Sequence, residues 1–189
     1  MPQSVLHTAR LALVPLADEH LPHEVELDSD PEVMRYLEPR ARTADEVAAF
    51  HERRLALADD GPGLGFWAGF LDGEFVGWWL LHVVHDDVQR PVRDQAELGY
   101  RLLRRHWRRG LASEGSRELL RHAFEDLGLT RVIAQTMAVN AGSRATMTSV
   151  GMVRERDFVA DGYEPVAGAE HGEVEYAITS EQWRRGQRP

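Results

Sequence analysis

The pattern of apolar and polar positions predicts an antiparallel first half of the fold. Apolar residues alternate through His7–Leu13, which predicts a first strand. Two apolar runs, over Phe66–Leu71 and Phe75–Val84, flank an Asp-Gly pair, which is typical of a β-hairpin. Trp78 and Trp79 are neighbours in the second of these runs, so we expect their side chains on opposite faces of the sheet.

Helices are predicted where apolar residues recur every three or four positions. Thr43 is followed three residues later by Glu46, the spacing of a capping box, and the helix that starts there continues to the break at Gly61. A second amphipathic helix ends at Gly128, since glycine commonly terminates helices. A third is predicted over Asn140–Val150, with Asn140 as its N-cap.

The second half of the chain alternates strands with helices, which indicates a strand-helix-strand unit and an α+β fold with a mixed sheet. Its length of 189 residues suits one hydrophobic core, so a single domain over residues 1–189 is expected. The remaining predicted elements are strands over Gln95–Leu102, Arg131–Met137, Met152–Ala160 and Val174–Thr179, a loop over Asp161–Gly172 and a short turn over Glu181–Arg185.

Composition and charge narrow the range of chemistries. The chain has no cysteine and no lysine, which excludes disulfides, thiolate nucleophiles and lysine Schiff bases. With 31 acidic and 22 basic residues the net charge is −9, which disfavours nucleic acid and favours cationic amines as partners. No apolar run approaches the ~20 residues of a membrane span, and no signal for secretion is recognisable. We therefore expect a cytoplasmic protein with no membrane partner.

One segment departs from the acidic balance. Five arginines fall between residues 101 and 109, just before the second amphipathic helix. Gly110 and Ala112 let the main chain at this turn approach a ligand closely, and the first turn of a helix offers unpaired N–H groups and a partial positive charge. Arginines beside it can add charge-assisted bonds to phosphate. The turn therefore predicts a phosphate-binding site, although a solvated surface turn would show the same local pattern.

The residues of this turn also resemble a known family. Trp107–Ala112 is similar to the acyl-CoA loop of the GNAT superfamily of N-acetyltransferases, which lies between a strand and a helix. Trp107 together with the Ala-x-Glu sequence at residues 112–114 resembles the RimJ/RimL-like branch, whose members acetylate ribosomal protein N-termini. Arg108 stands where that branch usually has glycine, and Met152 where it has phenylalanine.

Other marks of this branch occur in order along nearly the whole chain: Thr8–Leu11, Asp30–Val33, Glu97–Leu102, Asn140–Ser143 and Val150–Met152. The resemblance implies a twisted mixed sheet of about seven strands, splayed at the centre and flanked by helices. It implies an acyl-CoA-dependent N-acyltransferase that uses acetyl-CoA as cosubstrate and an amine as acceptor. A homodimer is a further expectation.

The resemblance also assigns residues to the binding of the cosubstrate. Pantetheine is expected in the split between two strands, with the phosphates on the turn. The expected contacts are Leu102, Leu103, Trp107, Arg108, Arg109, Gly110, Leu111, Ala112, Ser113 and Asn140. No metal ion is expected, because His82 and His85, near two aspartates, lack a defined third and fourth ligand.

Acyl transfer to an amine needs a base for the amine proton and a donor for the departing thiolate. Glu97 is the expected base, since it precedes the part of its strand that contacts the cosubstrate, while His82, His85 and Glu173 are weaker candidates. The resemblance implies Ser143 as the proton donor. An exposed strand carboxylate and a helix-capping pair are the plainer interpretations of Glu97 and Ser143.

Two other functions are consistent with the residues. The first is a non-catalytic, regulatory acyl-CoA-binding module, and the second is a nucleic-acid binder built on the arginine cluster, which the net charge disfavours. The acceptor stays open among a protein N-terminus, an aminoglycoside-like antibiotic, an amino acid and a polyamine. Acetyl and succinyl donors are not distinguished.

Overall fold

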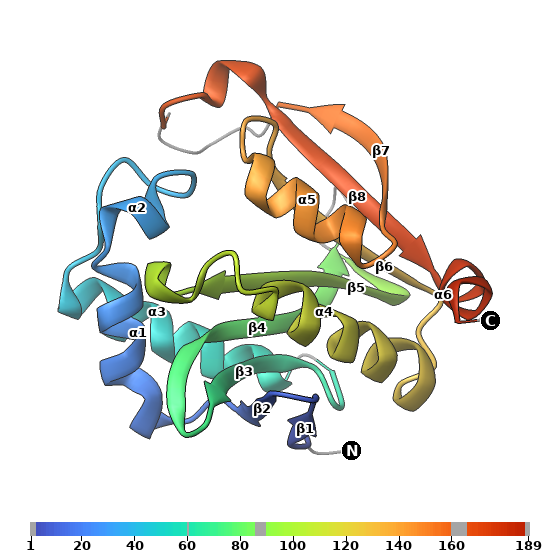
Figure 1. The fold of residues 1–189 in the computed structure, drawn as a ribbon, viewed down its shortest axis with the longest axis horizontal. Coiled ribbons are helices and arrows are strands. Elements are labelled where there is room, and N and C mark those ends of the chain that lie inside the picture. The colour runs from blue at the N-terminus through green and yellow to red at the C-terminus, as the bar shows by residue number, and fades with distance from the viewer. Residues whose placement is uncertain (1–2, 60, 86–89, 160–165, 188–189) are drawn as a thin grey trace.

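The strands of the chain form one mixed sheet with helices on both faces (Figure 1). The computed structural model describes residues 3–59, 61–85, 90–159 and 166–187. Within these ranges the sheet has eight strands in the order β1-β2-β3-β4-β5-β6-β8-β7. Strands β5 and β6 are parallel and the other neighbours antiparallel, which confirms the predicted α+β class and mixed sheet.

The strands are β1 Leu6–His7, β2 Leu11–Pro15, β3 Gly65–Leu71, β4 Glu74–His85, β5 Pro91–Leu102, β6 Arg131–Met137, β7 Val153–Phe158 and β8 Glu173–Thr179. The helices are α1 Leu21–Asp28, α2 Pro31–Met34, α3 Ala44–Ala56, α4 Leu111–Arg121, α5 Ala141–Ser149 and α6 Ser180–Gly186. A 3₁₀ turn, η3, covers Arg104–His106, and α4 continues into a π-helical turn over His122–Asp126.

The local signals of the sequence are confirmed where they fix a turn or a cap. Thr43 and Glu46 form the predicted capping box at the start of α3. Asn140 caps α5 by accepting a hydrogen bond from the Ser143 N–H at 3.1 Å. The Asp-Gly pair joins β3 to β4 with both residues in the left-handed region, at φ 52° and 83°, as a two-residue hairpin turn requires.

Two predicted elements are wrong. The expected first strand over residues 7–13 is a small hairpin of β1 and β2, in which Leu6 pairs with Leu13. The Thr8 hydroxyl accepts from the Leu11 N–H at 2.8 Å and stabilises the turn, and alternation of apolar residues does not reveal such a side-chain bond. The expected C-terminal turn is the helix α6, which begins with a capping box between Thr179 and Gln182.

Strand β4 divides the core, because its two tryptophans point to opposite faces as predicted. Trp79 is fully buried under α4, where its Nε1 donates to the Ala112 carbonyl at 3.3 Å. The helix comes this close because Gly115 has no side chain: a Cβ there would lie 2.4 Å from the Trp79 ring. Trp78 belongs to a second cluster with Leu27 of α1 on the other face. The start of α4 is therefore fixed to the sheet by packing.

The face that carries α1 and α3 holds a buried group of charges. Asp28 accepts from Arg54 at 2.8 Å, from Arg42 at 3.1 Å and from Arg101 of β5 at 2.5 Å. Burial opposes ionisation of Asp28, but the neighbouring guanidinium groups outweigh it and hold its pKa below the ordinary value. This network ties α1 to β5 beside the centre of the sheet.

The centre of the sheet opens as expected. Strands β5 and β6 pair only where Gln95–Glu97 faces Arg131–Ile133. Beyond Glu97 the two strands diverge while each keeps its outer partner, β4 or β8. The main-chain groups along the inner edge of β5 therefore lack a strand partner from Leu98 onward.

Candidate functional site

The open edge of β5 directs main-chain groups of Leu102 into the split. The Leu103 N–H donates to Val76 of β4 at 3.0 Å, and alternate residues of an antiparallel strand point their N–H and C=O groups to opposite sides. The Leu102 carbonyl accepts from the Trp107 Nε1 at 2.8 Å. Both main-chain groups of Leu103 are engaged, since its carbonyl accepts from the His106 N–H at 2.9 Å. Of these two residues, Leu102 thus has its N–H placed toward a ligand in the split, while its carbonyl already accepts from Trp107.

The turn after β5 ends in a helix start without a side-chain cap. Gly110 is the N-cap of α4 with φ 76°, and no side chain accepts from the first N–H groups of the helix. These groups belong to Leu111, Ala112 and Ser113, and they point out of the helix end together with its partial positive charge. An anion at this position would satisfy them.

The arginine cluster is largely neutralised, with two exceptions. Arg109 donates to His106 Nδ1 at 2.8 Å and meets no carboxylate in the described part of the chain. Arg108 makes no hydrogen bond or ion pair with another described residue, so the free positive charge of the turn lies on these two side chains. The other three pair with carboxylates: Arg101 with Asp28, Arg104 with Asp30, and Arg105 with Glu26 and Glu74.

Arg108 also has an unusual main-chain conformation. Its φ is 58°, in the left-handed region that side chains with a Cβ adopt at a cost. This explains physically why glycine suits the position in the branch that the sequence resembles. In this chain an exposed arginine occupies it instead.

The turn is also tied to the N-terminal hairpin through Glu114. This carboxylate accepts from the Thr8 hydroxyl at 2.6 Å, from the Arg10 N–H at 2.9 Å and from Arg10 Nε at 2.7 Å. Arg10 Nη1 in turn donates to the Arg109 carbonyl at 3.1 Å. Burial acts to raise the pKa of Glu114, but the hydrogen bonds from Thr8 and Arg10 outweigh it and hold the pKa below the ordinary value. Both segments carry residues that resemble one branch of the family, but no local pattern in the sequence indicates that they touch.

The expected base has a histidine beside it. Glu97 and His82 are direct partners across β5 and β4, and Glu97 Oε2 lies 3.4 Å from His82 Nε2. Both side chains are a little over a quarter exposed. Glu97 shares its face of β5 with Arg101, and so lies on the face opposite α4. The structure therefore brings together two of the base candidates that the sequence considered separately.

The other base candidates lie elsewhere. His85 ends β4 and is exposed. Glu173 begins β8 opposite Met137, and burial raises its pKa. The metal suggestion also involved Asp86 and Asp87, which lie outside the described residues. Within the described ranges, no group of three or more acidic or histidine side chains could hold a metal ion, and no helix is long and apolar enough to cross a membrane.

The expected proton donor lies on α5 against β5. Tyr100 Oη is 3.0 Å from Ser143 Oγ and 3.1 Å from the Ser143 carbonyl. Both ends of the Asn140 side-chain amide make hydrogen bonds within the fold. Its oxygen accepts from the Ser143 N–H, and its nitrogen donates to Thr136 Oγ1 at 3.1 Å. The Ser113 hydroxyl contacts Ser149 Oγ at 2.7 Å. The direct contacts of these side chains with a cosubstrate remain predictions.

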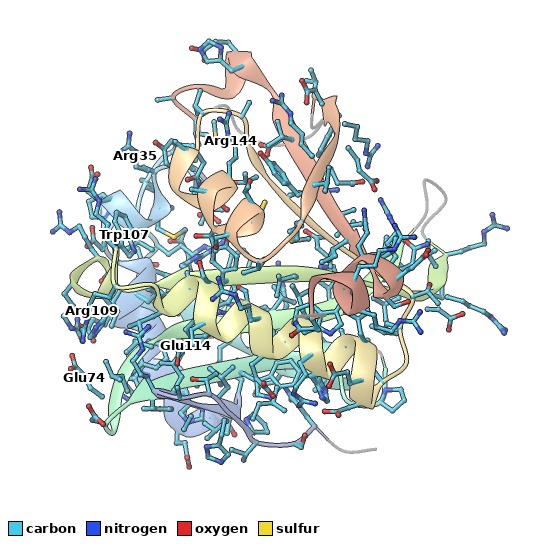
Figure 2. The ribbon with its side chains drawn as sticks, turned by 45° about the vertical axis from the view of Figure 1, so that its right-hand side comes forward. Arg35, Glu74, Trp107, Arg109, Glu114 and Arg144 are labelled. Atoms are coloured by element: carbon cyan, nitrogen blue, oxygen red, sulfur yellow. The ribbon has the colours of Figure 1, made fainter. Side chains whose placement is uncertain are left out.

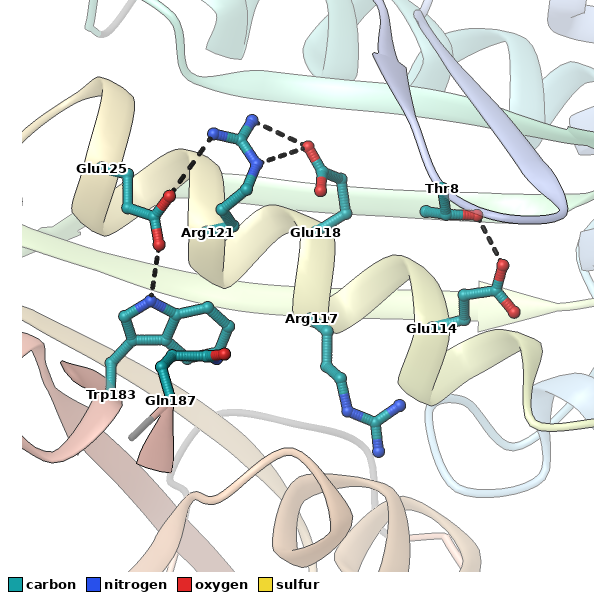
Figure 3. A pocket seen from close by; sticks show the side chains of 8 residues that line it. All are labelled: Thr8, Glu114, Arg117, Glu118, Arg121, Glu125, Trp183 and Gln187. Carbon is teal, nitrogen blue, oxygen red and sulfur yellow. Dashed lines mark hydrogen bonds and ion pairs between the residues drawn. The ribbon is translucent and has the colours of Figure 1, made fainter. Parts of the chain in front are cut away.

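A shallow groove runs along the outer side of α4 toward α6 (Figure 3). Its charged groups already have partners: Glu118 binds Arg121, Glu125 accepts from Trp183 Nε1 at 3.0 Å, and Arg117 donates to the Ser149 carbonyl at 2.9 Å. Among the charged residues of this groove, Arg117 alone meets no carboxylate in the described part of the chain, so the groove has less free positive charge than the turn with Arg108 and Arg109.

The splayed sheet with an uncapped helix start beside it is the arrangement that the sequence led us to expect for a GNAT-family acetyltransferase. The family model for an acetyltransferase (GNAT) domain matches residues 10–153, and the chain belongs to this family. It is accordingly an N-acetyltransferase with acetyl-CoA as cosubstrate, as the sequence predicted. The chain is 44% identical over 191 residues to the FsC-acetyl coenzyme A-N(2)-transacetylase of Aspergillus fumigatus, covering 99% of this chain and 81% of that protein.

Solved structures show the same fold. An acetyltransferase of the GNAT family from Bacillus anthracis superposes with a TM-score of 0.75 at 22% identity, covering 94% of this chain and 99% of that one. RimJ of Mycobacterium smegmatis, solved in complex with a CoA disulfide, gives 0.76 at 21% identity, covering 96% and 95%. These likenesses support the fold.

Proposed function

We propose that the protein transfers an acetyl group from acetyl-CoA directly to a primary amine. The observation that carries this proposal is the uncapped start of α4, with the free charges of Arg108 and Arg109 beside it, next to the open edge of β5. The phosphates would bind the N–H groups of Leu111–Ser113, and the Leu102 main chain would bind pantetheine. The thioester would then lie in the split near Glu97 and Ser143.

In the proposed reaction, Glu97 accepts the proton that the amine loses as its nitrogen attacks the thioester carbonyl. His82 faces Glu97 at 3.4 Å and is placed to orient this carboxylate. The carbon–sulfur bond then breaks as the Ser143 hydroxyl donates a hydrogen bond to the departing thiolate, and the proton that Glu97 took from the amine passes to the thiolate or to solvent, which restores both side chains. A thiol pKa of about 8.5 makes the thiolate a tolerable leaving group, so the donor contributes only a modest part of the rate.

Small-molecule amines are the first candidate acceptors. The Aspergillus fumigatus relative is named for transfer to N(2) of FsC, and it aligns with 99% of this chain. Protein N-termini are the second candidate, favoured by Trp107 and the Ala-x-Glu sequence that resemble the RimJ/RimL-like branch. Acidic residues near the split, Glu97 among them, suit a cationic amine of either kind.

Thiol release with several acyl-CoAs against a library of amines and peptides tests the proposal. We expect turnover with acetyl-CoA and at least one amine, and none in the Gly110→Asp variant, whose carboxylate would repel phosphate. Calorimetric binding of acetyl-CoA without thiol release from any acceptor would support a regulatory binding module instead. Equal acetyl-CoA affinity of the wild type and Gly110→Asp would contradict the phosphate site.

We also propose the domain organisation, location and assembly of the protein. The 189 residues act as one acyltransferase domain, in the cytoplasm, without nucleic acid and with a homodimer as the assembly to be tested by light scattering. The net charge of −9 supports the exclusion of nucleic acid.

A further inference from the structure

A buried histidine lies directly behind the turn over residues 108–112, the proposed phosphate site, which we call the phosphate turn. His106 belongs to η3 and is 2% exposed. Its Nδ1 lies 2.8 Å from Arg109 Nη1, and its Nε2 lies 3.1 Å from Glu74 Oε1. Figure 2 shows Arg109 and Glu74 at the end of the molecule where α4 begins. The imidazole thus bridges a free cation and the first residue of β4.

The two contacts define which nitrogen carries the proton. A guanidinium has only donors, so His106 Nδ1 accepts from Arg109 and carries no hydrogen. The ring is then neutral with its proton on Nε2, which donates to the Glu74 carboxylate. Arg105 also donates to Glu74, at 3.0 Å, and this hydrogen bond lowers the pKa of Glu74 so that it stays an acceptor. Hydrogen bonds therefore run in one direction from Arg109 through His106 to Glu74.

A neutral acceptor such as the His106 imidazole can hold Arg109 in place without cancelling its positive charge. A carboxylate against Arg109 would hold the guanidinium but cancel its charge, as happens to Arg104 with Asp30. His106 fixes one Nη of Arg109 and leaves the full positive charge available to an anion. A bound phosphate would therefore meet an arginine that is already oriented, so less side-chain entropy is lost on binding.

We propose that His106 is a positioning residue that holds Arg109 for the phosphates of acyl-CoA. This inference rests on the proposed function. Because His106 is the buried residue of η3 and is bonded to Glu74 of β4, the relay also anchors the turn to that strand. The residues that would bind phosphate then depend on a side chain that touches no ligand itself.

Variants of His106 test the proposal through two donors, acetyl-CoA and S-acetyl-pantetheine, which lacks the phosphates. His106→Leu should weaken acetyl-CoA binding about tenfold by calorimetry and leave kcat/KM with S-acetyl-pantetheine unchanged. His106→Asn keeps an oxygen acceptor near the place of Nδ1 and should restore most of the affinity. Arg109→Ala should lose at least as much affinity as His106→Leu, and the double variant should lose no more than Arg109→Ala alone.

Equal losses with both donors, or additive losses in the double variant, would overturn the proposal and leave His106 a packing residue. If His106→Leu fails to fold, Glu74→Ala provides the measurement, since Glu74 is half exposed and its loss should reduce acetyl-CoA affinity severalfold through the same relay. A wild-type protein that binds no acetyl-CoA would instead contradict the proposed function, so the two failures are distinguishable.

Discussion

The two hydrogen bonds between Tyr100 and Ser143 have defined directions. The Ser143 carbonyl can only accept, so the Tyr100 hydroxyl, 3.1 Å away, donates to it. The Ser143 hydroxyl, 3.0 Å from Tyr100 Oη, is then the donor of that second bond. Burial raises the pKa of Tyr100, which keeps its proton in place. Ser143 must therefore turn its hydroxyl away from Tyr100 to donate to a departing thiolate.

Removal of the Ser143 hydroxyl should slow the chemical step. We expect Ser143→Ala to lower kcat roughly tenfold to a hundredfold, from a donor contribution of about 1–3 kcal/mol, with little change in acetyl-CoA affinity. Tyr100→Phe is the matched control, because it frees the serine proton and should cost less than threefold in kcat. A larger loss in Tyr100→Phe than in Ser143→Ala would make the tyrosine the proton donor.

The Glu97–His82 pair should shape the dependence of the rate on pH. In Glu97→Gln we expect kcat to fall at least tenfold and the acid limb of the kcat profile to flatten, because that limb reports ionisation of the base. His82→Asn should lower kcat by a smaller factor and keep the limb, since the carboxylate remains. A Glu97→Gln profile parallel to that of the wild type would place the base elsewhere, with Glu173 the next residue to test.

The buried charges around Asp28 should make the fold acid-sensitive. Its pKa is lower in the folded chain than in the unfolded one, so its contribution is complete above about pH 3.9 and is lost as the pH falls through the folded value. Asp28→Asn should cost about 3–5 kcal/mol of unfolding free energy at neutral pH, because it leaves buried arginines without their partner. It should also flatten the decline of stability in acid.

Urea unfolding at several pH values measures both effects. Glu181→Gln is a suitable control, since Glu181 forms an exposed pair with Arg185 and the change should leave the unfolding midpoint unaltered. An Asp28→Asn variant as stable as the wild type would mean that the network contributes no net stability.

The sequence predicted features that depend on neighbouring residues and missed those that depend on distant ones. The Thr43–Glu46 capping box and the Asp-Gly hairpin each depend on residues within a few positions of one another, so they can be recognised in the sequence. The contact of Arg10 with Glu114 joins residues 104 positions apart, and no local pattern encodes it. The His82–Glu97 pair follows from the register of two strands, which apolar alternation leaves undetermined.

The phosphate turn was predicted from its glycine and arginines. Which of those arginines pair with carboxylates was not predicted. Neutralisation depends on carboxylates from α1, from Asp30 at the start of α2 and from β4, which the fold alone brings to the cluster. The sequence could therefore predict a phosphate site, whereas the structure was needed to show that Arg108 and Arg109 meet no carboxylate among the described residues.

Replacing Arg108 with glycine should separate stability from binding. At φ 58° glycine avoids the steric cost of a Cβ, which exceeds the entropy that glycine gains in the unfolded chain, so Arg108→Gly should raise the unfolding free energy by about 0.5–1 kcal/mol. The same change removes one of the two free charges of the turn, and acetyl-CoA affinity should fall about threefold to tenfold.

Arg108→Ala distinguishes the two causes, because it removes the charge but keeps a Cβ in the left-handed conformation. It should lose the same affinity as Arg108→Gly without the gain in stability, as measured by calorimetric titration and urea unfolding on the same samples. Salt should narrow the difference in affinity between wild type and both variants, because screening weakens an exposed guanidinium–phosphate contact. If Arg108→Gly binds acetyl-CoA as tightly as the wild type at low salt, the guanidinium does not contact phosphate, and the left-handed arginine is a strain that the binding site does not use.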